Sequence, residues 1–131
     1  MQLSATTDYG IRIVLYLIKN NEIISSGVLA EQLEIPKTYV LKVTKKLELA
    51  NIVTSYQGVN GGIGLAGDPA QITLWDVISA VESTTVINKC MEQENEYDVK
   101  AEDYCKLRKV YGLLQQAVED RLQSIKLIDL T

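Results

Sequence analysis

The chain has 131 residues, of which 47% are hydrophobic and 23% charged, a composition that suits one compact domain, alone or with a helical extension. It contains no histidine, which excludes catalytic triads and zinc sites that need an imidazole. The formal net charge is −4, yet residues 1–67 hold six basic against five acidic side chains, whereas residues 68–131 hold seven against twelve. A basic surface for a polyanionic partner is therefore expected only in the first half.

The expected cellular location rests on two features of the hydropathy pattern. No stretch approaches the roughly 20 uninterrupted apolar residues that a membrane span needs. The first residues, MQLS, lack the basic start and apolar run of a signal peptide. We therefore expect a cytoplasmic protein with no membrane partner, in which the two cysteines, Cys90 and Cys105, are reduced thiols or ligands and not a disulfide framework.

Three helices are predicted in the first part of the chain. Apolar residues recur at helical spacing over residues 7–19, and Asp8 with the two threonines before it supplies N-cap chemistry. A second helix begins near Ser25 and must end before Pro36, which fits poorly inside a helix. Pro36 instead suits the first turn of a third helix, residues 37–50, which is apolar on one face and lysine-rich on the other. The inward positions of that helix are Val40, Val43, Leu47 and Ala50.

A β-hairpin and a fourth helix follow. Residues 52–55 and 63–66 have the β-branched and apolar character of short strands. Between them a turn containing residues 58–62 is predicted, in which Asn60-Gly61 is a strong tight-turn signal because both positions tolerate positive φ. Thr73 is placed to cap the fourth helix, in which apolar residues again recur at helical spacing.

The last part of the chain is predicted to be a loop followed by one long helix. Residues 83–102 have no sustained hydrophobic period and hold a cluster of acidic side chains, so we expect a solvated loop. Residues 103–126 form the helix, and its apolar positions with 4-3-4 spacing are Leu107, Tyr111, Leu114 and Val118. Because a long, one-sided helix in a short chain needs a partner, we expect a two-fold homodimer.

The predicted elements are, in order, a helix, a helix–turn–helix and a glycine-tipped hairpin. This is the order of a winged helix–turn–helix, a mainly α fold with a small β-hairpin wing. In this fold the third helix enters the major groove and the wing reaches the DNA beside it. The candidate DNA-binding residues are Lys37, Thr38, Tyr39, Lys42 and Lys45 on the helix and Gln57 and Asn60 on the wing. The alternative is a helical bundle with a hairpin, whose lysines form only a solvated surface.

An enzyme is not expected. The sequence offers no nucleophile–base pair of the kind that hydrolases and transferases use. The glycines within residues 58–64 precede a strand and are not followed by a Lys-Ser or Lys-Thr pair, so they do not form a phosphate-binding loop.

The chain resembles the Rrf-two family of bacterial transcription regulators over nearly its whole length, and most closely over residues 1–82. The family includes an iron–sulfur-cluster regulator, a nitric-oxide-sensing repressor and a cysteine-metabolism repressor. The matching blocks are TDYGIR at 7–12, IPKTYV at 35–40, GVNGGIGLA at 58–66 and ITLWDVISAVE at 72–82. The resemblance implies a homodimeric repressor on a pseudo-palindromic operator. It divides the chain into a DNA-binding domain (1–82), a flexible sensor loop (83–102) and a dimerisation helix with a C-terminal tail (103–131).

The family also implies a sensor. In its cluster-bearing members, three cysteines on the segment 83–106 and one residue of another element hold an iron–sulfur cluster, for which soft, anionic thiolates are suited. By this resemblance Cys90 and Cys105 correspond to the first and last of those cysteines, and Asp8 to a ligand given by the partner subunit. The middle cysteine is missing, so a fourth ligand would be another carboxylate or an exogenous donor.

Other interpretations of these three residues stay open. Asp8 is placed to cap the first helix. Cys90 and Cys105 are separated by a loop short enough to close in an oxidant-dependent disulfide, or they have no role. A family member without a cluster would respond instead by binding a regulatory protein partner, as the cysteine-metabolism repressor does with a biosynthetic enzyme.

Two positions depart from the pattern of many relatives and bear on operator choice. Where relatives often carry an arginine before the wing glycine, this chain has Gln57, which lacks the charge that favours a narrow minor groove. Leu41, in the third helix, stands where relatives are often polar. We therefore expect an operator different from that of the iron–sulfur regulator.

Overall fold

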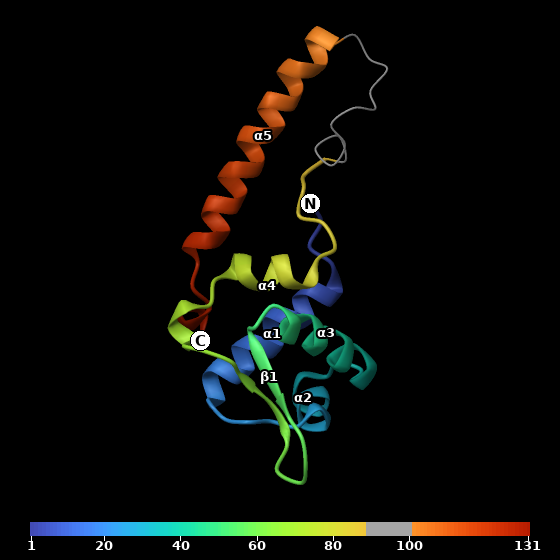
Figure 1. Cartoon of the computed structure of the whole chain (residues 1–131), viewed down its shortest axis with the longest axis vertical. Coiled ribbons are helices and arrows are strands. Elements are labelled where there is room, and N and C mark those ends of the chain that lie inside the picture. The colour runs from blue at the N-terminus through green and yellow to red at the C-terminus, as the bar shows by residue number, and fades with distance from the viewer. Residues whose placement is uncertain (89–100) are drawn as a thin grey trace.

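The computed structural model describes the backbone of residues 1–88 and 101–131, and the side chains of residues 1–88 and 106–131. The main elements are α1 (Ala5–Asn20), α2 (Ser26–Leu33), α3 (Lys37–Leu49), β1 (Val53–Tyr56), β2 (Gly62–Leu65), α4 (Leu74–Val81) and α5 (Ala101–Ser124). Two short 3-10 helices, η1 (Pro69–Gln71) and η3 (Leu127–Leu130), precede α4 and follow α5. Helices α1 to α4 and the hairpin form one body, from which α5 projects (Figure 1). The last helix thus begins and ends two residues earlier than predicted.

Capping side chains and the backbone geometry of proline explain why three of the helices begin where the sequence predicts. The hydroxyl of Ser25 accepts a hydrogen bond from the first turn of α2, at 3.2 Å. Helix α3 begins directly after Pro36, which occupies the N-cap and has no side-chain hydrogen bond. Thr73 and Asp76 form a reciprocal capping box at the start of α4, with distances of 3.1 and 2.9 Å.

The N-cap of α1 differs from the prediction. Ser4, and not Asp8 or the threonines before it, caps this helix, and its hydroxyl accepts from the Thr7 N–H at 3.3 Å. Asp8 lies in the first turn with an exposed side chain. The reason is a long-range contact: the N–H and hydroxyl of Ser4 both donate to Glu82, and the helix begins two residues earlier than predicted.

The hairpin is present and its turn lies within residues 58–62, as predicted, but Asn60-Gly61 is not the centre of the turn. Strands β1 and β2 pair antiparallel, with Val53 opposite Leu65. The turn closes where the Gly61 N–H donates to the Gly58 carbonyl at 3.0 Å, and the positive φ falls on Gly58, at 97°, and not on Asn60. A Cβ on Gly61 would lie 2.3 Å from the Tyr56 carbonyl oxygen, so close backbone approach, and not positive φ, requires glycine there.

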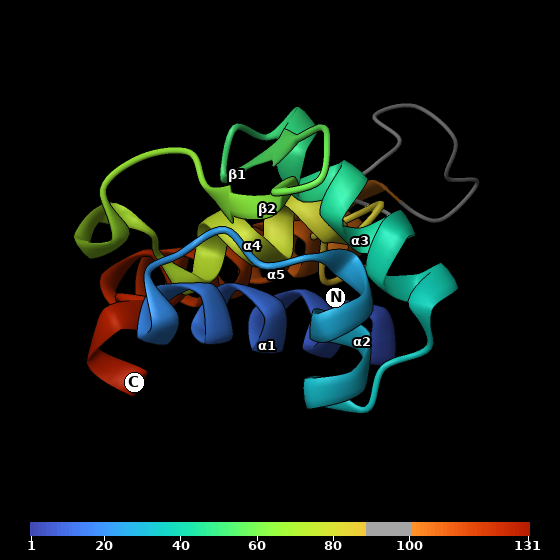
Figure 2. The ribbon, with the colours of Figure 1, turned by 90° about the horizontal axis from the view of Figure 1, so that it is seen from below.

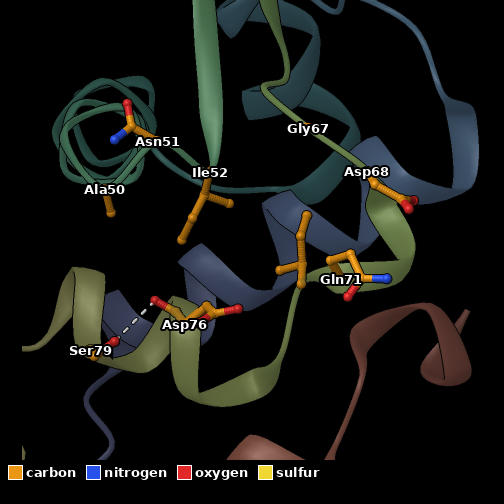
Figure 3. Close-up of a pocket in the computed structure, with 9 residues that line it drawn as sticks. Ala50, Asn51, Ile52, Gly67, Asp68, Gln71, Asp76 and Ser79 are labelled. Atoms are coloured by element: carbon orange, nitrogen blue, oxygen red, sulfur yellow. Dashed lines mark hydrogen bonds between the residues drawn. The ribbon is translucent and has the colours of Figure 1, made fainter.

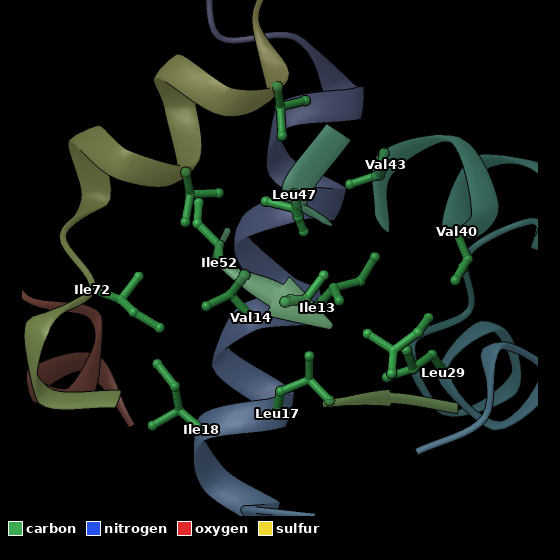
Figure 4. Packing of buried hydrophobic residues seen from close by; sticks show 14 of the residues in the cluster. Ile13, Val14, Leu17, Ile18, Leu29, Val40, Val43, Leu47, Ile52 and Ile72 are labelled. Atoms are coloured by element: carbon green, nitrogen blue, oxygen red, sulfur yellow. The ribbon is translucent and has the colours of Figure 1, made fainter. Parts of the chain in front are cut away.

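One hydrophobic core joins the four helices of the body and the hairpin (Figure 4). Its fully buried members from these helices are Ile13, Val14, Leu17, Leu29, Val40, Val43, Leu47 and Val77. Ala50 was expected to face inward but is exposed, because it lies beyond the last turn of α3. Leu127 of η3 is also fully buried, so the segment after α5 returns to the body.

Helix α5 is attached to the body at its C-terminal end and, through the buried side chain of Gln115, to the backbone of Thr85 and Ile87. Backbone hydrogen bonds from Leu74 to Ile125 (2.8 Å) and from Leu127 to Ile72 (3.0 Å) hold its C-terminal end beside α4. Its exposed apolar residues are Leu107, Val110, Leu113, Leu114 and Val118, with exposed fractions of 36% to 73%. Among the described helices, none is long and apolar enough to cross a membrane.

Candidate nucleic-acid interface

The solvent face of α3 carries the cationic residues that the sequence singled out. Helix α3 contains four lysines and one glutamate. Because Val40, Val43 and Leu47 point into the core, the opposite face is left to solvent. The exposed residues on that side include Lys37, Thr38, Leu41, Lys42 and Lys45. Besides its lysines, this face carries the apolar side chains of Leu41 and, at the end of the helix, of Leu49.

Tyr39, at the start of α3, also packs against α1. Its ring meets that of Tyr9 in α1 edge-on, with ring centroids 5.7 Å apart and an interplanar angle of 66°. The side chain remains 43% exposed. Tyr39 therefore braces the start of α3 against α1 while its ring stays accessible from solvent.

A groove of about 510 Å³ lies between α3 and the hairpin. Leu41, Thr44 and Lys45 line it from the helix, and Ser55 and Gln57 from the hairpin. The structure thus brings the predicted residues Lys45 and Gln57 to one groove. The other predicted residues, Lys37, Thr38, Tyr39, Lys42 and Asn60, are exposed outside its lining.

The hairpin is held firmly beside the helix–turn–helix. Ile24, in the connection between α1 and α2, exchanges two backbone hydrogen bonds with Ile63 of β2, at 2.9 and 2.8 Å. A Cβ on Gly62 would lie 2.6 Å from the Ile24 carbonyl oxygen, so glycine permits this approach. Seen from below, the connection runs alongside the hairpin (Figure 2). The groove is consequently a fixed feature of the body, and no signal within a single element predicts it.

The Arg12 guanidinium, which the sequence pattern did not single out, donates to the carbonyl of Leu33 at the end of α2. This contact satisfies a C-terminal carbonyl of α2 and ties α1 to the helix–turn–helix. Together with the Tyr9–Tyr39 contact, it fixes the position of α3 from two sides.

Glu82 forms the strongest polar junction outside the interface. One carboxylate oxygen accepts from the Ser4 N–H (2.9 Å), the Ser4 hydroxyl (3.0 Å) and the Thr7 hydroxyl (2.5 Å). Burial raises the pKa of Glu82, but these hydrogen bonds and the charge of Lys46 outweigh it and hold the pKa below its ordinary value. Because Lys46 also donates to the Val81 carbonyl at 3.1 Å, the junction connects α1, α3 and the end of α4.

The predicted sensor residues are not brought together within the part of the chain that the structure describes. Cys90 lies outside the described residues, and Cys105 falls within α5 with its side chain undescribed. Asp8 is exposed on α1. Among the described residues, no group of three or more His, Cys, Asp or Glu side chains is placed to hold a metal ion. The ligand set therefore stays a prediction.

A second hollow, of about 380 Å³, lies between the end of α3, the segment after β2 and α4 (Figure 3). Two of its polar side chains, those of Asp76 and Ser79, form hydrogen bonds within α4. Asp76 belongs to the capping box, and the Ser79 hydroxyl donates to the carbonyls of Trp75 (2.8 Å) and Asp76 (3.2 Å). Two of the polar groups that line the hollow are thus already hydrogen-bonded within α4.

Comparison with known proteins agrees with this architecture. A model of the Rrf-two (Rrf2) family, described as iron-dependent transcriptional regulators, matches residues 3–131. The HTH-type transcriptional regulator NsrR of Shouchella clausii is 29% identical over 128 residues, covering 96% of this chain and 83% of that protein. A solved structure described as a transcriptional regulator from Listeria innocua is 30% identical, with a TM-score of 0.78 and coverage of 99% and 85%.

CymR (YrzC), the global cysteine regulator of B. subtilis, is 24% identical, with a TM-score of 0.77 and coverage of 99% and 95%. At that identity the likeness concerns the fold. The predicted fold class, mainly α with a hairpin wing and a long C-terminal helix, is confirmed.

Proposed function

The chain belongs to the Rrf2 family of transcriptional regulators, and we propose that it acts in the cytoplasm as a homodimeric repressor on a pseudo-palindromic DNA operator. The observation that carries this proposal is the lysine-rich, exposed face of α3 beside a groove closed by the hairpin. A polyanion is attracted to such a face even though the whole chain is acidic, because the opposing charges lie mostly in the second half.

Each predicted interface residue then has a role that fits its position. Lys37, Lys42 and Lys45 are exposed on α3, where long cationic side chains reach phosphates. Thr38 and Tyr39, in the first turn of α3, supply hydroxyls for phosphates or base edges. On the hairpin, Gln57 and Asn60 supply amides that contact the backbone or the adjacent minor groove.

The homodimer follows from α5. Leu107, Leu114 and Val118 are 44%, 50% and 36% exposed and lie on one face of this helix. Burying that stripe against a second copy removes apolar surface from water and presents two α3 helices to DNA. A two-fold protein reads a pseudo-palindrome with one copy on each half-site.

An in vitro selection from random-sequence duplexes tests the proposal. The intact chain should enrich a pseudo-palindromic sequence, and the selected duplex should lose salt-dependent binding when lysines of α3 are removed. We expect Lys42→Ala with Lys45→Ala to weaken binding about tenfold or more and to flatten its salt dependence, because each lysine neutralises a phosphate. The matched pair Lys106→Ala with Lys109→Ala, which alters the net charge equally on α5, should leave binding nearly unchanged. Failure to enrich any sequence would contradict the proposal.

For the sensor we propose the segment that carries Cys90 and Cys105. The chain has only these two cysteines and no histidine, so with Asp8 it offers three of the four protein ligands of a cluster. Cluster binding and oxidation to a disulfide both require the two thiols. Cys90→Ser and Cys105→Ser should therefore each abolish the response of DNA binding to oxidants.

Anaerobic purification, followed by absorbance, iron and sulfide assays and thiol titration, separates the two chemistries. A brown protein with matched iron and sulfide identifies a cluster, and loss of colour in Asp8→Ala identifies its third ligand. A colourless protein with two titratable thiols that disappear on oxidation identifies the disulfide. A response that survives both cysteine substitutions would overturn the sensor proposal and favour a regulatory protein partner.

A further inference from the structure

Leu41 is an apolar side chain in the middle of the cationic face of α3. It is 51% exposed, although the core positions of α3 are already filled by Val40, Val43 and Leu47. Lys37 precedes it by four residues and Lys45 follows it by four, so the three side chains lie in one row along the helix. The core therefore gives no reason for a leucine at this position.

The residues around Leu41 indicate which chemical group of a DNA partner it would contact. It lines the groove between α3 and the hairpin together with polar residues, among them Lys45, Glu48 and Gln57, and with Tyr56 and Ile63 of the hairpin. Lysine and glutamine can bind phosphates and polar base edges, but a leucine side chain has no donor or acceptor. In the major groove of DNA the one apolar group that base pairs display is the 5-methyl group of thymine.

We propose that Leu41 specifies thymine in the operator by packing against its 5-methyl group. The proposal rests on the function proposed above, because it places α3 in the major groove. Lys37 and Lys45, one turn to each side, hold the helix to the phosphates while Leu41 supplies base discrimination. The contact buries about one methyl group, which corresponds to a roughly fourfold gain in affinity for each half-site.

Deoxyuridine tests this contact directly, since it differs from thymidine only by lacking the methyl group. In the duplex selected by the intact chain, each thymine is replaced singly by deoxyuridine, and the dissociation constants are measured for the native chain and for Leu41→Ala. We expect one symmetry-related thymine position at which deoxyuridine weakens binding of the native chain about fourfold. At that position Leu41→Ala should bind the two duplexes equally well.

Leu49→Ala is the matched control. Leu49 is 78% exposed at the end of the same helix, but it borders α4 and not the groove. This variant should keep the full sensitivity to deoxyuridine. Because Leu41 and Leu49 are both exposed, neither substitution should disturb folding, which circular dichroism checks.

The outcomes separate the two proposals. If selection enriches no sequence, the DNA-binding proposal itself fails. If a sequence is enriched but deoxyuridine weakens binding nowhere, or weakens Leu41→Ala as much as the native chain, Leu41 does not read thymine. A second selection with Leu41→Ala should lose the preference for thymine at the identified position and retain the rest of the sequence.

Discussion

The body, formed by α1 to α4 and the hairpin with η3 packed against them, differs from the projecting helix α5 in how its apolar residues are covered. In the body, side chains such as Ile13 and Leu47 are fully buried within the chain. In α5, Leu113 and Leu114 are 73% and 50% exposed. The body therefore contains a core, whereas α5 carries an apolar face that the described residues leave exposed.

This difference separates two roles in one small chain. The body keeps α3 and the hairpin beside each other, and the Ile24–Ile63 pairing contributes to this arrangement. A helix with an uncovered stripe is suited to bring two such bodies together. Between them, Gln115 of α5 is buried and binds the backbone of Thr85 and Ile87 at 2.8 Å, which joins the helix to the end of the body.

The largest effect is expected from a cavity in the body. Leu47→Ala removes a fully buried side chain from α3, and we expect it to lower the free energy of unfolding by about 2–5 kcal/mol. Urea unfolding at a fixed protein concentration measures the change. The control Leu49→Ala, on the exposed end of the same helix, should stay within about 0.5 kcal/mol of the native chain. Equal effects would mean that α3 does not pack as described.

The second-largest effect is expected when two copies of the chain can no longer associate through α5. Leu107→Glu with Leu114→Glu places two charges on the apolar stripe, and we expect the dimer dissociation constant to rise about 100-fold or more. Sedimentation equilibrium measures it, and circular dichroism should show an intact body. Gln123→Glu adds a negative charge on the opposite face of α5 and should leave the dimer intact. A dimer that tolerates both glutamates would remove α5 from the interface.

A smaller, pH-dependent effect is expected at the junction around Glu82. Glu82→Gln should lower the free energy of unfolding at neutral pH by about 1.5 kcal/mol, because a charged acceptor of three hydrogen bonds becomes neutral. Since the pKa of Glu82 is lowered from 4.5 in the folded state, the unfolded state binds the proton first on acidification. The stabilisation is therefore complete above pH 4.5 and disappears as the pH falls through the folded pKa.

Urea unfolding of the native chain and of Glu82→Gln between pH 7 and about pH 3 measures this dependence. The difference between their free energies of unfolding should become smaller as the pH is lowered. Glu31→Gln, on the exposed surface of α2, serves as control. A gap that stays constant with pH would show that ionisation of Glu82 does not contribute to stability.

The smallest effect is expected from removing a single lysine that binds phosphate. Lys42→Ala should weaken binding to the selected duplex about fivefold, uniformly over related sequences, and reduce the salt slope by about one, because one phosphate is no longer neutralised. Fluorescence anisotropy at several salt concentrations gives both quantities. Lys109→Ala on α5 controls for the change in net charge. Unchanged affinity and slope for Lys42→Ala would place this lysine outside the interface.

The sequence predicts those parts of the fold that depend on neighbouring residues. Ser25 and Thr73 cap their helices by accepting from backbone groups three residues away, and Pro36 separates α2 from α3 by its own geometry. The exposed lysines of α3 follow from helical periodicity once the buried positions are known. These features require no knowledge of the rest of the chain.

Interactions between residues that are distant in the sequence could not be predicted, because no local pattern indicates them. Ser4 caps α1 and is held by Glu82, 78 residues further along the chain. Gly61 is required by the Tyr56 carbonyl across the turn, which the Asn60-Gly61 signal does not encode. The groove depends on the Ile24–Ile63 pairing, which no periodicity indicates.

A hydroxyl-radical footprint of the intact chain on the selected duplex tests most directly the claim that two copies read DNA through α3 and the hairpin. A symmetric regulator should protect two equivalent patches, related by a two-fold axis and separated by whole helical turns of about 34 Å. Lys42→Ala should weaken both patches equally. One asymmetric patch, or protection that persists without the lysines of α3, would contradict the claim.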